Sequence, residues 1–254
     1  MPRIGRVSPL DTPVLSAAYF QADTIKGYRF WDQTGVVANH YVDRFQTIEY
    51  IAPGTLVCAR PRDPGDDLGE VRVNPHAIWL SFRERSALDH IAREASGQVD
   101  WIARACDVTD FSRLGLRVLL LWPANGSEEV VDLLASTFMQ VQRQGWQEFG
   151  DIVGGEFALF LTSDRLAIRV SFSPIQNVTT SWSARAPGSN VQAPSESVIP
   201  PERRLPDFAL QMDVDLADNN PADPLDPRHH LERSIRMLET KLIPHVATIL
   251  TGGA

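Results

Sequence analysis

The stretch Phe111–Pro123 has the sequence FSRLGLRVLLLWP and carries the strongest strand pattern in the chain. From Leu114 onward, every second residue is apolar, as expected of side chains that share one face of a strand. The other face begins with Arg113, Gly115 and Arg117 and then becomes apolar. Such a strand starts at a solvated end and continues into a region that is buried on both sides. The pattern therefore predicts a central strand of a sheet.

The composition is that of an ordinary globular protein. The chain has 254 residues, of which 43% are hydrophobic and 22% are charged, enough for one large domain or two small ones. The formal net charge of −8 gives no broad basic surface, so we expect no nucleic-acid partner.

Several features of the sequence favour a cytoplasmic location. The N-terminus has no apolar run long enough for a signal peptide, and no segment approaches the roughly 20 apolar residues of a membrane helix. We therefore expect no membrane association. Cys58 and Cys106 lie far apart without metal-type spacing, and we expect two reduced thiols.

The order of predicted elements suggests two similar α+β halves, residues 1–108 and 109–254, each with a strand, a helix, three strands and a helix. Strand patterns cover residues 14–21, 47–51, 55–59 and 77–82, then 114–122, 156–161, 166–172 and 209–217. Helical patterns cover residues 31–45 and 83–105, the latter interrupted by Gly97, and follow Ser127 and Asp226. Residues 61–70 are expected to form an acidic loop, and Pro53 with Gly54 a type II turn.

This order predicts mainly antiparallel sheets with helices on one face. The first strand of each half should lie beside the last, which pairs residues 113–122 with residues 209–217. No repeat is visible residue by residue, so the duplication is inferred from element order alone. Residues 173–206 are rich in Ser and Pro and predict a long loop.

Asp213 and Asp215 alternate with apolar residues, so both carboxylates should leave the same face of their strand. They are weak candidates for a divalent metal site, with Asp218, Asn219 or Asp223 as further ligands. Two structural alternatives are favoured over a metal site. In one, the aspartates keep an exposed sheet edge soluble by their charge, and in the other they form ion pairs with Arg113 and Arg117 on the neighbouring strand. A third interpretation has the two arginines clamp an oxyanion, with Gly115 allowing its close approach.

The remaining motifs and residues give weaker indications of a functional site. The chain has no phosphate-binding loop, dinucleotide fingerprint, nucleophile elbow or zinc-protease motif, and we expect no cofactor. His229 and His230 diverge by about 100° on a helix, which favours a solvated pair over a metal site. Trp182, an aromatic residue in the polar 173–206 segment, is typical of an anchor for a protein partner.

The segment around Arg113, Gly115, Leu116 and Arg117, together with the later 212–215 segment MDVD, resembles a sporadically distributed family of uncharacterised bacterial proteins. That family has a mid-chain R-x-G-L-R strand and a late strand in which apolar residues alternate with Asp. This chain departs from it at Val118 and Leu119, where the family tends to have Tyr and Asn. The resemblance brings no established activity, and the family's patchy distribution suggests association with defence or mobile elements.

These features favour a non-enzymatic cytoplasmic binding or regulatory protein. Its partner would be a protein, engaged by the 173–206 loop and the groove between the halves. The alternative is a metal-dependent enzyme that acts on a phosphoryl substrate through Asp213, Asp215, Arg113 and Arg117. The sequence leaves the oligomeric state open.

Overall fold

The computed structural model describes residues 13–25, 27, 29–51, 54–83, 86–139, 156–163, 165–176, 206, 208–219 and 226–250. The described chain is of mixed α and β structure and is built on one antiparallel sheet of nine strands, in the order β2-β3-β4-β5-β1-β6-β9-β8-β7. The strands are β1 (Val14–Thr24), β2 (Phe45–Ile51), β3 (Thr55–Pro61), β4 (Leu68–Asn74), β5 (Ala77–Phe82), β6 (Phe111–Pro123), β7 (Phe157–Ser163), β8 (Leu166–Gln176) and β9 (Phe208–Asp218).

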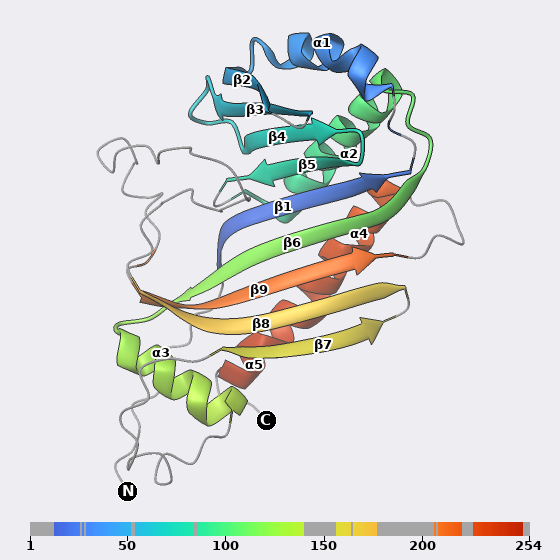
Figure 1. The fold of residues 1–254 in the computed structure, drawn as a ribbon. Helices are drawn as coiled ribbons and strands as arrows, with labels where there is room; N and C mark the ends of the chain where they lie inside the picture. The colour runs from blue at the N-terminus through green and yellow to red at the C-terminus, as the bar shows by residue number, and fades with distance from the viewer. Residues whose placement is uncertain are drawn as a thin grey trace, which may run out of the picture.

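The helices pack on one face of this sheet, which we call the covered face. Figure 1 shows α2, α4 and α5 behind the strands, with α1 beside β2 and α3 at the opposite end. The helical segments are α1 (Phe30–Tyr41), α2 (Leu88–Ala105), α3 (Ser127–Leu133), η1 (Leu134–Met139), α4 (Pro227–Met237), η5 (Leu238–Leu242) and α5 (Ile243–Leu250), where η marks a π-helical turn.

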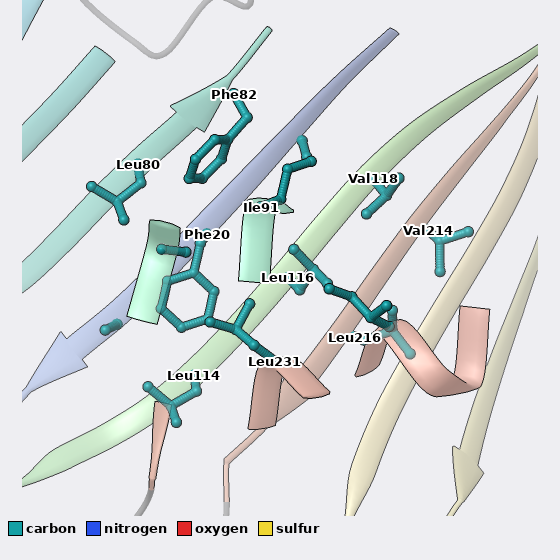
Figure 2. Close-up of a cluster of buried hydrophobic side chains, with 14 of the residues drawn as sticks. Phe20, Leu80, Phe82, Ile91, Leu114, Leu116, Val118, Val214, Leu216 and Leu231 are labelled. Carbon is teal, nitrogen blue, oxygen red and sulfur yellow. The ribbon is translucent and has the colours of Figure 1, made fainter. Parts of the chain in front are cut away.

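The core lies between the covered face and the helices. Phe20, Leu116 and Leu216 from three adjacent strands meet Ile91 of α2 and Leu231 of α4, as Figure 2 shows, and all five are completely buried. Burying a large apolar side chain contributes about 1.5–3 kcal/mol, so this layer supplies most of the driving force for folding.

The predicted central strand is confirmed. β6 pairs with β1 on one side and β9 on the other, and Val118 lies opposite both Ala18 and Val214. The predicted pairing of residues 113–122 with residues 209–217 is therefore also confirmed. Buried apolar residues on both flanks explain why this strand has the longest apolar pattern.

The first half differs from the prediction in one element. β4 begins within the last three residues of the expected acidic loop and continues to Asn74, so four strands, rather than three, follow α1. A shift in strand pairing between Leu68 and Glu70 breaks the alternation of apolar residues, and this shift hides the strand in the sequence.

Two boundaries also differ. Phe45 opens β2 instead of closing α1, and α2 continues through Gly97 without a break. Gly97 lies on the exposed side of α2, where a Cβ would meet no atom within 4 Å. The buried residues of α2 therefore pack without a break at this glycine.

The glycine of the predicted turn and the predicted start of the last helix are confirmed. Gly54 between β2 and β3 has φ of 99°, in the left-handed region that favours glycine. At the start of α4, the Asp226 carboxylate accepts a hydrogen bond from the backbone N–H of Arg228 at 2.9 Å, and Pro227 occupies the first helical position. The π-helical turn η5 ends at Leu242, two residues before Pro244. An irregular turn at this place fits the absence of a backbone N–H in proline.

Within the described ranges, none of the helices combines the length and the apolar character needed to cross a membrane.

Candidate functional site

The face of the sheet opposite the covered face carries the sequence-predicted site residues, and no described helix packs on it. We call it the open face and define it by the charged residues of β4, β6, β8 and β9 that point away from the core, together with Tyr19 and Gln21 of β1. Strand register places Tyr19, Arg117, Asp215 and Arg169 in one row across four neighbouring strands. Arg113, Gly115, Arg117, Asp213 and Asp215 are thus brought together, as predicted from their alternation.

Arg117 and Asp213 form an ion pair on this face that is held by two hydrogen bonds. Arg117 Nε donates to Asp213 Oδ1 at 2.9 Å, and Arg117 Nη2 donates to Asp213 Oδ2 at 2.6 Å. The Asp213 side chain is only 9% exposed, whereas that of Arg117 is 49% exposed. The hydrogen bonds to Asp213 raise the pKa of Arg117, so this guanidinium is charged at physiological pH.

Arg113 and Asp215 form a looser pair, with 3.6 Å between Nη2 and Oδ2 and about a third of each side chain exposed. Gly115 lies between Arg113 and Arg117, and a Cβ on it would come within 2.9 Å of both terminal nitrogens of Arg113. The space that we expected to admit a ligand therefore holds the Arg113 guanidinium. Gly115 thus lets the Arg113 side chain lie close against its own strand.

Two further arginines of the open face also have carboxylate partners. Arg169 of β8 is 3.3 Å from Glu156, just before β7, and 4.0 Å from Asp213. Arg72 of β4 contacts Glu70 on the same strand. Each of the four arginines on this face is consequently paired with an acidic side chain, and the face carries no excess of positive charge.

Tyr19 lies directly opposite Arg117 in the sheet. Burial raises the pKa of Tyr19, the charge of Arg117 lowers it, and the charges of Asp213 and Glu70 raise it, with a net increase. The phenol is thus a neutral hydroxyl among charged neighbours, suited to donating or accepting a hydrogen bond.

Asp218, one of the further metal ligands considered, does not join the two aspartates. Asp218 faces the covered side, where its Oδ2 lies 3.0 Å from Arg233 of α4 and 3.4 Å from Arg165. Asp223 lies outside the described residues. Within the described part of the chain, no three His, Cys, Asp or Glu side chains gather as a metal site. Since both oxygens of Asp213 accept hydrogen bonds from Arg117, the arrangement corresponds to the cross-strand ion pairs that the alternation favoured.

The predicted 173–206 loop overlaps the end of β8. Residues 173–176, which we assigned to the loop, are the last residues of β8, and that assignment was wrong. Trp182 and nearly all of the rest of the 173–206 segment lie outside the described residues.

His230 also departs from the prediction, because it is only 3% exposed. Its ring lies on α4 with its centre 6.2 Å from that of Phe20. Burial, and next the charge of Arg233, lower the pKa of His230 to about 4, so the ring is neutral at physiological pH. Only His229 of the pair is exposed, as expected of residues that diverge around a helix.

Tyr19, Arg169 and Glu156 belong to the site but were not predicted. Alternation in the first strand places Tyr19 and Gln21 on one face, which was a usable signal. Arg169 and Glu156 depend on the register of β8 against β9 and β7, which no local pattern defines.

Comparisons with protein-family models, with curated proteins and with solved structures found no match to this chain.

Proposed function

We propose that this protein is a binding or regulatory protein without catalytic activity, and that its open face docks a protein partner. The observation that supports this is the pairing of every arginine on that face with a carboxylate. These pairs hold charges of both signs at fixed positions across four strands. A surface of this kind favours a partner with a complementary mixed pattern, because charge patterns determine which partner fits and in which orientation.

A nucleic acid is a poorer fit to the same face. Binding to a phosphate backbone depends on basic groups that are free to replace counterions. The arginines already neutralise Asp213, Asp215, Glu156 and Glu70, and the whole chain carries a formal net charge of −8.

The alternative, a metal-dependent enzyme for a phosphoryl substrate, has less support. A divalent cation would have to displace Arg117 from both oxygens of Asp213 and would gain no ligand from Asp218, which faces the other side. If purified protein hydrolyses a phosphoryl substrate with added divalent metal, and if Asp213→Ala abolishes this activity, the alternative replaces the binding proposal.

A cytoplasmic location and the duplication of the two halves belong to the same proposal. In support of the duplication, β1 and β6 lie side by side at the centre of the sheet, each followed in sequence by a helix. The helices that close the two halves, α2 and α4, pack against each other. The four strands after α1, against three after α3, count against an exact repeat.

The binding proposal is tested by exchanging charges without changing their number. In the variant R113D/D215R, the loosely paired residues trade places, which inverts the pattern that a partner meets. The matched control R228E/E232R makes the same kind of exchange in an exposed pair on α4, 3.0 Å apart. The protein that co-purifies with the full chain is identified, and its dissociation constant is measured for both variants.

We expect R113D/D215R to weaken binding by at least tenfold, and R228E/E232R to leave it unchanged. Equal dissociation constants for the two variants would show that the partner does not dock on the open face. Deleting residues 178–204 in a third variant measures the part played by the Ser/Pro-rich segment independently.

A further inference from the structure

β7 is an edge strand with an unusual composition. Its sequence, FALFLTS, contains no charged residue, no proline and no glycine. Leu159, Phe160 and Leu161 are 40%, 78% and 44% exposed. Among the described strands, β7 pairs only with β8, so its outer backbone N–H and C=O groups have no strand partner there.

The opposite edge of the sheet is protected differently. β2 contains Glu49, which is exposed, and it is flanked by α1. Natural proteins place charges, prolines or covering segments at edge strands, because a bare edge is a template for pairing with another chain. β7 has none of these devices within its seven residues, although it exposes three large apolar side chains in succession.

We propose that β7 pairs antiparallel with β7 of a second copy of this chain, centred on Phe160, and joins the two nine-stranded sheets into one. The strand is self-complementary about that residue. In an antiparallel strand, alternate residues direct their backbone groups to opposite sides. The residues whose backbone N–H and C=O groups point outward are either 158, 160 and 162 or 157, 159, 161 and 163. Both sets are symmetric about Phe160, so each outward N–H or C=O group meets a backbone partner in the second copy.

The side chains are symmetric in the same way. Leu159 and Leu161 lie opposite the buried residues Val170 and Ile168 of β8, on the covered face. Pairing centred on Phe160 places Leu159 of one copy opposite Leu161 of the other, which extends the apolar layer across the joint. The two Phe160 rings meet on the open face, where cross-strand aromatic pairs are favourable.

Charge limits how far this pairing can extend. Within Phe157–Ser163, self-pairing opposes no like charges, whereas the same register one residue beyond either end brings Glu156 of one copy opposite Asp164 of the other. A seven-residue strand is about 24 Å long, so the joint is narrow compared with the roughly 1,600 Å² of a standard stable interface. We therefore expect a dimer that dissociates on dilution. This inference is independent of the proposed binding function.

Single cysteines measure the register directly. A mixture of A158C and T162C chains should form disulfide-linked dimers under mild oxidation, because these residues face each other at about 4.5–5.5 Å between Cα atoms. Each variant alone is the matched control, since two copies of residue 158, or of residue 162, would lie about 14 Å apart. Cys58 and Cys106 are buried, and burial raises their pKa values to about 12 and about 11, so they stay unreactive.

Sedimentation velocity over a range of concentrations supplies the second measurement. We expect the wild-type chain to dimerise with rising concentration, and F160K to remain monomeric at concentrations at which Y50K dimerises. Tyr50, on the opposite edge, is 53% exposed and serves as the control position. A wild-type chain that is monomeric at all concentrations would overturn the proposal. Equal cross-linking in the mixture and in the single variants would also overturn it.

Discussion

The two faces of the sheet are made from alternate residues of the same strands, yet they differ in how they are stabilised. On β6, Leu116 is completely buried against α4, whereas its neighbour Arg117 is half exposed and held by Asp213. The covered face excludes water and supplies stability, and the open face arranges charges at fixed positions. Residues one position apart in this chain should therefore respond to mutation in different ways.

The largest effect is expected from the covered face. Leu116→Ala should lower the free energy of unfolding by about 3 kcal/mol, because it removes buried methyl groups and leaves a cavity. Leu119→Ala, on the same strand but on the other face, should cost about 1 kcal/mol, since Leu119 is only partly buried. Urea denaturation of both variants checks the comparison, and equal losses would contradict it.

His230 should make the covered face sensitive to acid. Its pKa is about 4 in the folded chain, against an ordinary 6.5, so the unfolded chain takes up a proton first as the pH falls. Its contribution to stability is therefore complete above pH 6.5 and is lost as the pH falls toward 4. The expected loss is about 3 kcal/mol.

Measurements of unfolding free energy against pH test this expectation. The His230→Leu variant keeps every other titrating group and should show a shallower decline between pH 6.5 and 4. Parallel curves for the two proteins would contradict a neutral, buried His230.

On the open face, the tight ion pair should have a smaller effect. Asp213→Asn should cost about 2 kcal/mol, because it weakens two charge-assisted hydrogen bonds of a nearly buried carboxylate. Arg117→Leu should remove the same interaction. In a double-mutant cycle, the combined loss should therefore be less than the sum of the single losses, and additive losses would show that the pair does not couple.

The smallest effect is expected at the looser pair. Asp215→Asn should cost no more than about 0.5 kcal/mol, since both members of the Arg113 pair are about one-third exposed and 3.6 Å apart. Thermal unfolding compared with that of Asp213→Asn measures the difference. If the two substitutions are equally costly, distance and burial do not rank the two pairs.

The sequence was sufficient to predict the centre of the sheet, because an alternating apolar pattern determines which residues share a face. The pairing of β6 with β9, and hence the meeting of Arg117 with Asp213, followed from element order. The sequence was insufficient to predict β4, because a shift in register breaks its alternation. It was also insufficient to place Arg169, because the neighbours of this residue depend on the pairing of β8.

His230 shows a further limit. The sequence indicated that the two adjacent histidines diverge around α4, but not which of them would face Phe20. The apolar stripe of Leu231, Ile235 and Leu238 shows which side of α4 packs on the sheet, but this spacing does not show how far burial extends around the helix to His230.

We propose that the open face recognises a partner while the covered face stabilises the fold. This division of roles is tested by the dissociation constant of the co-purifying protein for R113D/D215R relative to R228E/E232R, with both variants shown to unfold at the wild-type temperature. We expect binding at least tenfold weaker for R113D/D215R. Identical affinities at unchanged stability would contradict it.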